Sequence, residues 1–270
     1  MPKQPSFRRF ALTLALAAVA ATLGCPGPMP RERSPYLSDG AAVGSVTQGH
    51  VASTTGCRLD TQLHRPERPR TDALVVLAHG FLRDQEHMSG LAAGLAQSGI
   101  PTLTLSFCNS RFWDGRHSMN ALDMRRVADF AGARRLVYAG FSAGGLSALV
   151  AARNDPRTVG VLTLDLVDEG GLGEEAARGL TVPMVALVGE PAPCNAQNRG
   201  LAVSAASPEA QVIPITGARH CDFESPTDWV CETLCARPDR GSEARRRLVI
   251  ETSVIAVGGM LGLGQDSVGS

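Results

Sequence analysis

The most informative segment of the chain is RRLVYAGFSAGGLSALVAARND, residues 134–155. It joins a short apolar run to a Gly-x-Ser-x-Gly turn at residues 140–144, and then to small residues with a helical pattern. Such a turn holds a serine oxygen off the end of a strand, and its glycines let neighbouring segments approach a sharply bent backbone. The segment therefore predicts a strand, a tight turn and a helix, with Ser142 as the candidate nucleophile.

Apolar runs of strand length alternate with helical patterns on both sides of this turn. The alternation predicts parallel strands joined by helical crossovers. The runs are nearly continuous in Val, Leu and Ile, so we expect an α/β sandwich: a mostly parallel central sheet covered by helices on both faces. The expected strands are Leu74–Ala78, Thr102–Phe107, Leu136–Ala139, Val159–Leu164, Pro183–Val188 and Ala210–Ile215. The expected helices are His87–Gln97, Met119–Phe130 and Leu146–Arg153.

Composition and turn chemistry indicate how this series begins. Residues 41–70 are rich in Gly, Thr and Pro, which favours antiparallel edge strands and turns at the start of the sheet. Ser118 is a candidate cap for the second expected helix. One core can extend over about 250 residues, so we expect a single domain over residues 41–270.

The charge balance argues against a polyanionic partner. Lys and Arg together number 26, as do Asp and Glu, so the formal net charge is zero. The sequence has no stripe of basic residues interleaved with aromatic ones, which is the usual footprint of nucleic-acid binding. We therefore expect no nucleic-acid partner.

The N-terminus has the pattern of an export signal. A few basic residues precede the apolar segment Phe10–Gly24, which is shorter than the roughly 20 residues that span a bilayer. The segment ends in TLGC, residues 22–25, which resembles a bacterial lipobox and predicts lipidation of Cys25 in the cell envelope. Residues 1–24 would then be removed, and the Pro-rich residues 25–40 would form a tether. The alternative is ordinary cleavage nearby and a soluble periplasmic or secreted protein.

Cysteine usage agrees with export. An even set of cysteines favours disulfides in an oxidising compartment, but six cysteines can pair in many ways and the sequence does not choose among them. A zinc site would favour C-x-x-C spacing, which the set lacks, so we expect no metal and no cofactor. We also expect Cys221 to be oxidised, with its bridge restraining the loop of the neighbouring His220. The six cysteines other than Cys25 are Cys57, Cys108, Cys194, Cys221, Cys231 and Cys235.

One histidine is placed to serve as a base for Ser142. A hydroxyl is a poor nucleophile at neutral pH and needs a base, which in turn needs a carboxylate to orient it. Where a nucleophile elbow carries such a triad, the chain order is Ser, acid, His. His220 is the only histidine after Ser142, and it lies just beyond the last expected strand. It is therefore the candidate base.

Three carboxylates are candidates for the acid that orients His220. Asp165 and Asp168 end the strand after the one that carries the nucleophile, and Glu190 ends the next strand. The carboxyl ends of parallel strands meet at one edge of a sheet, so each of these side chains is expected near Ser142. These observations alone leave all three candidates open.

The same edge offers backbone N–H groups for an oxyanion. Negative charge develops on a substrate carbonyl oxygen during attack, and two preorganised N–H groups are expected to receive it. One is that of Ala143, directly after the nucleophile. The other is that of Phe81 in AHGFLRD, residues 78–84, with Leu82 as its alternative. His79 in this segment is also consistent with simple local packing.

With these motifs in view, residues 50–260 resemble the α/β-hydrolase superfamily, and within it the branch of platelet-activating-factor acetylhydrolases and chlorophyllases. The likeness lies in AHGF for the oxyanion loop, GFSAGG for the elbow, LDLVDEGG for the acid and HCDF around the histidine. In that branch the acid follows the strand next after the nucleophile, which implies Asp165. The polyester hydrolases, which are also similar, take their acid one strand later, and this keeps Glu190 as the alternative.

The motifs and the resemblance together predict a serine hydrolase that cleaves carboxylic esters through an acyl-enzyme, with Ser142, Asp165 and His220 as its triad. Acyl transfer or amide hydrolysis would use the same groups, and a non-catalytic envelope lipoprotein on the same scaffold is a further alternative. We expect a monomer, a small-molecule or lipid ester as substrate and, if Cys25 is modified, a membrane as partner. The aromatic pair at residues 112–113 is a candidate for the acyl pocket, with rim packing as the alternative.

Overall fold

The computed structural model describes residues 43–111 and 114–264. The expected signal segment (residues 1–24), Cys25 and the expected tether (residues 25–40) lie outside the described residues, as does the aromatic pair at 112–113. Within the described ranges, no helix is both long and apolar enough to cross a membrane.

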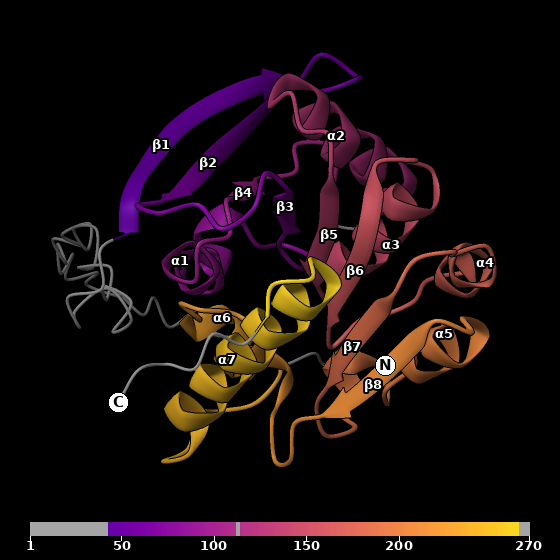
Figure 1. Ribbon diagram of the computed structural model, residues 1–270. Helices are drawn as coiled ribbons and strands as arrows, with labels where there is room; N and C mark the ends of the chain where they lie inside the picture. Colours follow the sequence, from indigo (N-terminus) through magenta and orange to yellow (C-terminus); the bar gives the residue numbers. More distant parts are fainter. Residues whose placement is uncertain (1–42, 112–113, 265–270) are drawn as a thin grey trace, which may run out of the picture. The chain divides into compact units, whose positions relative to one another are not determined.

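The centre of the fold is an eight-stranded sheet (Figure 1). Its strands are β1 (Val43–Ala52), β2 (Arg58–Pro66), β3 (Leu74–Ala78), β4 (Thr102–Leu105), β5 (Leu136–Phe141), β6 (Thr158–Leu164), β7 (Met184–Val188) and β8 (Ala210–Pro214). Their order across the sheet is β1-β2-β4-β3-β5-β6-β7-β8. β1 pairs with β2, and β2 with β4, in antiparallel fashion, while all the other pairs are parallel. The predicted parallel sheet and its antiparallel edge are confirmed.

Helices connect the strands, and the three predicted helices are confirmed. The first of them begins earlier than predicted, as a 3-10 turn at Gln85 that Asp84 caps. The helices are α1 (Ser89–Gln97), α2 (His117–Phe130), α3 (Ala143–Arg153), α4 (Leu172–Arg178), α5 (Gly200–Ala206), α6 (Trp229–Leu234) and α7 (Ser242–Met260). The 3-10 turns are η2 (Gln85–Met88), η3 (Pro193–Asn195) and η4 (His220–Phe223).

The predicted cap of α2 is wrong. The helix begins at His117, and the residue before it, Arg116, has a φ of 48° and makes no side-chain cap. Asn120 ties the first turn instead, because its side-chain amide donates a hydrogen bond to the carbonyl of Gly115 (2.9 Å). Ser118 therefore lies inside the first turn of the helix rather than before it.

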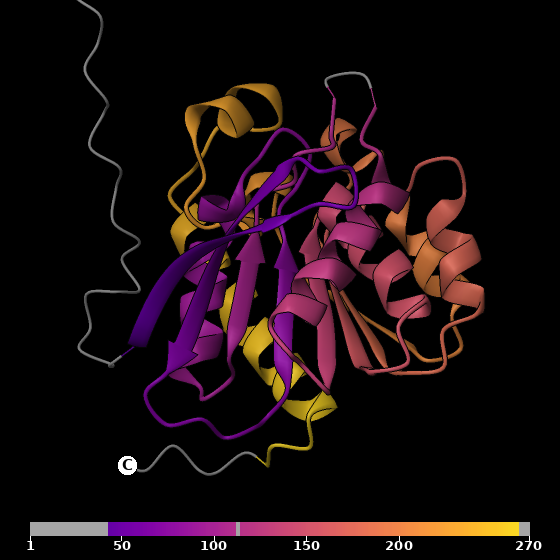
Figure 2. The same ribbon diagram turned by 90° about the horizontal axis from the view of Figure 1, so that it is seen from above.

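Helices cover both faces of the sheet, as the continuous apolar strands predict (Figures 1 and 2). Residues of α2, α3, α4 and α5 join the core on one face, and residues of α1 and α7 join the core on the other. Successive side chains of a strand point to opposite faces, so Val76 of β3 belongs to the first core while Val75 and Leu77 belong to the second. Burial of each such side chain stabilises the fold by about 1.5–3 kcal/mol.

The parallel strands carry their carboxyl ends to one edge of the sheet, where Figure 2 shows their arrowheads. At this edge β3 is followed by His79, β5 by Ser142, β6 by Asp165 and β7 by Gly189. In open α/β sheets, ligands bind outside the carboxyl ends of the strands. The fold therefore gathers the predicted site residues at the edge where a site is expected.

Candidate active site

The turn around Ser142 has the strained backbone that holds a nucleophilic serine off the end of a strand. Ser142 lies between β5 and α3 with φ 53° and ψ −121°, a conformation that costs about 1–3 kcal/mol for a residue with a side chain. A Cβ atom added to Gly140 would lie 2.3 Å from the carbonyl oxygen of Gly144, and one added to Gly144 would lie 2.2 Å from that of His79. Both glycines are therefore required by close backbone packing.

Ser142, His220 and Asp165 form one chain of hydrogen bonds. His220 Nε2 lies 3.1 Å from Ser142 Oγ, and His220 Nδ1 lies 2.6 Å from Asp165 Oδ2. A carboxylate can only accept, so Nδ1 carries the proton and Nε2 is the acceptor for the serine hydroxyl. All three residues are buried, and the structure thus brings the three predicted residues together in the order that proton transfer needs.

The backbone and one amide side chain hold the Asp165 carboxylate in place. The Gly189 N–H donates to Asp165 Oδ1 (3.0 Å), and Asn195 Nδ2 donates to Asp165 Oδ2 (3.2 Å) and to the carbonyl of Glu190 (2.8 Å). Asn195 is completely buried. Asn195 lies 30 residues after Asp165, and no local pattern in the sequence marks its role.

The two other candidate acids point elsewhere. Asp168 Oδ1 accepts a hydrogen bond from the Gly173 N–H (2.6 Å), where it supports the start of α4. Glu190 Oε1 accepts one from the Gly217 N–H (2.8 Å). The structure therefore pairs His220 with Asp165 and gives Asp168 and Glu190 backbone-supporting contacts.

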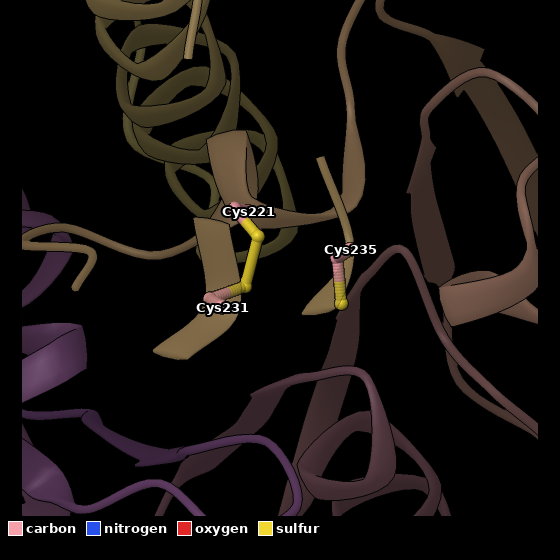
Figure 3. A group of neighbouring side chains, drawn as sticks. All are labelled: Cys221, Cys231 and Cys235. Atoms are coloured by element: carbon pink, nitrogen blue, oxygen red, sulfur yellow. A yellow bond between two sulfur atoms is a disulfide. The ribbon is translucent and has the colours of Figure 1, made fainter. Parts of the chain in front are cut away.

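His220 lies on a loop that is closed by a disulfide. We call residues 220–231 the base loop, and Figure 3 shows the bond between Cys221 and Cys231 near its two ends. The ring of His220 also packs against that of Phe141, with their centroids 4.7 Å apart. The expectation that Cys221 is paired next to the base is met.

The other described cysteines form two further disulfides, Cys57–Cys108 and Cys194–Cys235. The sulfur atoms of Cys221, Cys231 and Cys235 lie within 4.8 Å of one another, but each is already bonded to another sulfur. Zinc binds thiolates, and a disulfide offers none.

The segment after β3, residues 79–84, is called the oxyanion loop here. His79 Nδ1 lies 2.7 Å from the carbonyl oxygen of Gly80, and the Phe107 N–H donates to His79 Nε2 (3.0 Å). Nδ1 therefore carries the ring proton. Burial lowers the pKa of His79 to about 4, so the ring is neutral at physiological pH and keeps these two bonds. His79 is a brace for this loop, which is more than local packing.

This brace also sets the direction of the next N–H group. The carbonyl oxygen of Gly80 accepts hydrogen bonds from His79 and from the Arg83 N–H (3.3 Å). In a trans peptide the carbonyl and the following N–H point in opposite directions, so the Phe81 N–H is directed away from both donors. A Cβ added to Gly80 would lie 3.4 Å from Ser142 Cβ, which places this peptide beside the nucleophile.

The second predicted donor, the Ala143 N–H, belongs to the first residue of α3. The first N–H groups of a helix have no partner within the helix, and the positive end of the helix dipole favours negative charge there. Leu82, the alternative to Phe81, has a φ of 56° and an exposed side chain. Its backbone conformation lets the loop turn from Phe81 toward Arg83.

Known structures share this architecture. Est1E from Butyrivibrio proteoclasticus is 18% identical, and the match covers 77% of this chain and 99% of that one with a TM-score of 0.56. Dienelactone hydrolase from Anabaena variabilis is 20% identical, with 78% and 96% covered and a TM-score of 0.59. The chain has the α/β-hydrolase fold. An alpha-beta serine hydrolase homologue from Coxiella burnetii, 14% identical over 76% of this chain and 96% of its own with a TM-score of 0.59, is a further example of the fold.

Sequence comparison adds nothing to this likeness. No protein-family model matches the chain, and a search of curated proteins finds no match. The α/β-hydrolase fold therefore rests on the structure, and the activity must be argued from the residues at the carboxyl edge of its sheet.

Proposed function

We propose that the protein hydrolyses carboxylic esters through an acyl-enzyme. Ser142 Oγ attacks the ester carbonyl while His220 Nε2 takes the hydroxyl proton, and the Phe81 and Ala143 N–H groups receive the oxyanion. The intermediate expels the alcohol, which takes the proton back from His220. Water then attacks the acyl-enzyme while His220 takes its proton, and the second intermediate releases the acid as Ser142 Oγ regains the proton from His220.

The unbroken chain from Ser142 through His220 to Asp165, with links of 3.1 Å and 2.6 Å, carries this proposal. Acyl transfer to water requires three parts that the site contains. They are a serine on a strained backbone, a base whose tautomer is set by a buried carboxylate, and a braced N–H group beside the serine. One of the structures with this fold is named as the esterase domain from a Rhodothermus marinus protein, which supports an ester as the substrate.

The finer parts of the proposal rest on the sequence. The position of Asp165 after the strand next to that of Ser142 favours the branch of platelet-activating-factor acetylhydrolases and chlorophyllases. The N-terminal pattern favours an exported, lipid-anchored monomer that acts on small-molecule or lipid esters at the cell envelope. A panel of 4-nitrophenyl esters of increasing acyl length would identify the preferred substrate class.

Substitution of the nucleophile tests the proposed function. We expect Ser142→Ala to lower kcat by a factor on the order of 10⁴–10⁶, because the acyl-enzyme cannot form. Labelling of the wild type by a fluorophosphonate should disappear in this variant. Ser147→Ala is the matched control, since Ser147 lies on the same helix and its hydroxyl donates only to the Ala143 carbonyl (3.2 Å). Near-normal turnover by Ser142→Ala would refute the proposal.

A further inference from the structure

The oxyanion loop and the base loop are joined by a buried ionic contact. Arg83 Nη2 donates to Glu224 Oε1 (2.8 Å) and Arg83 Nε donates to Glu224 Oε2 (3.0 Å), which makes the pair bidentate. Arg83 Nη2 also donates to Asp228 Oδ1 (2.7 Å). The side chain of Arg83 is 6% exposed and that of Glu224 is completely buried. We call these three residues the loop clamp.

The loop clamp lies within a few residues of two groups that the proposed reaction uses. Arg83 follows Phe81 by two residues and belongs to the same turn, because its N–H donates to the Gly80 carbonyl. Glu224 follows His220 by four residues, inside the loop that the Cys221–Cys231 disulfide closes. A displacement of the clamp would therefore be felt at both the oxyanion donor and the base.

The strands that lead into these two loops are not neighbours in the sheet. The oxyanion loop follows β3, which is next to β5, whereas the base loop follows β8 at the far edge of the sheet. Backbone hydrogen bonds join the segments near the clamp: the Ser225 N–H donates to the His87 carbonyl (2.7 Å), and the Gly90 N–H donates to the Ser225 carbonyl (2.8 Å). Contact between loops, rather than a strand ladder, sets their spacing.

From this arrangement we infer that Arg83, Glu224 and Asp228 are positioning residues of the active site. The planar guanidinium, with both carboxylates on it, holds the Phe81 N–H and His220 at the separation that the tetrahedral intermediate needs. A misplacement of about 1 Å in such a site can lower the rate on the order of 10²-fold. This inference rests on the proposed ester hydrolysis.

A metal ion is the alternative occupant of this cluster. His87, Glu224 and Asp228 offer ligand atoms within 4.8 Å of one another. Arg83 already supplies a cation to both carboxylates. Burial lowers the pKa of His87, but its hydrogen bond to Asp84 and the nearby carboxylate of Glu224 raise it more, so the pKa lies above the ordinary value. A metal must displace the proton from an imidazole before it binds, and a raised pKa makes this displacement more costly.

Substitutions of Arg83 test the loop clamp. In Arg83→Met, measured at temperatures where the variant is folded, we expect kcat to fall on the order of 10²-fold while KM changes less than about threefold. The matched control is Arg157→Met. Arg157 contacts buried Asp155 (2.7 Å) just before β6. This is the amino end of the parallel strands, away from the site, so loss of Arg157 should lower Tm and leave kcat unchanged.

A second readout reports on the oxyanion donors themselves. A thionoester places sulfur where the ester has oxygen, and sulfur accepts N–H hydrogen bonds poorly, so an intact oxyanion site prefers the ester. We expect the ester-to-thionoester ratio of kcat/KM to fall in Arg83→Met and to stay at the wild-type value in Arg157→Met. A purely structural ion pair would move Tm but not this ratio.

The outcomes separate the clamp from the proposed function. If Arg83→Met lowers Tm but keeps the wild-type kcat and the wild-type ratio, the inference is wrong. If Arg83→Met does not fold, Glu224→Gln and Arg83→Lys are judged by the same two criteria, because each keeps the volume and removes the bidentate pair. If the wild type hydrolyses no ester, or Ser142→Ala is as active as the wild type, the proposed function itself fails and the inference fails with it.

Discussion

The two carboxylate oxygens of Asp165 have different partners. Oδ2 accepts from the His220 ring, and Oδ1 accepts from the Gly189 N–H. Asn195 contacts both oxygens through its side-chain amide, at 3.3 Å and 3.2 Å. The carboxylate therefore cannot rotate without breaking several hydrogen bonds, and the ring of His220 is held in one tautomer.

Comparison of amide variants at the three candidate acids is a direct test of this assignment. We expect Asp165→Asn to lower kcat by a factor on the order of 10⁴. If the amide oxygen keeps its contact to the Gly189 N–H, the amide NH2 group faces His220 Nδ1 and favours the tautomer with its proton on Nε2. Asp168→Asn and Glu190→Gln are the controls and should change kcat only slightly. A larger loss in Glu190→Gln than in Asp165→Asn would favour the polyester-hydrolase arrangement.

His64 on β2 makes the protein sensitive to acid. It is 3% exposed, and neither ring nitrogen has a hydrogen-bond partner among the described residues. Burial lowers its pKa from 6.5 to about 4. Below its ordinary pKa the unfolded chain binds a proton that the folded protein does not, so stability falls as the pH falls from about 6.5 toward 4.

Replacement of His64 by an apolar residue should remove this contribution. We expect His64→Leu to stabilise the protein by about 1 kcal/mol, because an unpaired buried polar group is lost, and by more at pH 5 than at pH 7.5. Denaturant unfolding at these two pH values measures the effect. The exposed His50 on β1 provides the control: His50→Leu removes no buried unpaired group and should not stabilise the protein. An equal gain at both pH values would contradict the account.

At the scale of elements, the base loop combines a 3-10 turn, a disulfide and the start of α6. Removal of its disulfide with the double change Cys221→Ser/Cys231→Ser leaves no unpaired thiol. We expect kcat to fall about tenfold or more at temperatures where the protein is folded, because the position of His220 is no longer restrained. Stability should fall by about 2–4 kcal/mol.

The disulfide Cys57–Cys108 is the matched control, since it lies outside the base loop and the oxyanion loop. Its double serine variant should lose stability while keeping kcat. If both variants show a lowered Tm and an unchanged kcat, the Cys221–Cys231 bond stabilises the fold but does not position His220. Non-reducing peptide mapping establishes the pairing before either measurement.

The elements that the sequence predicts best are those with a uniform environment. β3 reads LVVLA and is buried at every position, and β5 and β7 are also buried throughout; a strand covered on both faces has no polar positions to obscure its pattern. α7 is different. It carries arginines in its first turns and exposes Ile255, so its apolar stripe does not stand out and the helix was not predicted from the sequence.

The triad residues could be proposed from the sequence because strand ends and chain order restrict the choice. The roles of Asn195 and of the loop clamp could not be predicted from the sequence. Asn195 contacts an acid 30 residues away, and Arg83 contacts Glu224 across 141 residues. Such pairs depend on how loops fold onto each other, which no local periodicity encodes. The pairing of the cysteines was open for the same reason, since it follows from the topology of the whole sheet.

At the scale of the whole molecule, the proposed anchor predicts where the mature chain begins. Mass spectrometry of the protein from its natural host should find Cys25 as the first residue, with attached acyl chains. Cys25→Ser should leave the chain unprocessed or release it from the membrane fraction. A soluble mature chain that begins at another residue would remove the anchor, and the ester hydrolysis proposed for the domain would stand.

The base reaches the nucleophile from 78 residues further along the chain, and its loop is closed only once Cys231 is present. During synthesis, the turn that carries Ser142 therefore emerges long before His220. Disulfides form in oxidising compartments, so on the proposed export route the base loop is completed after translocation. By the roughly tenfold loss of kcat expected without the Cys221–Cys231 bond, a chain retained in a reducing cytoplasm would be a slower hydrolase than the exported, oxidised one.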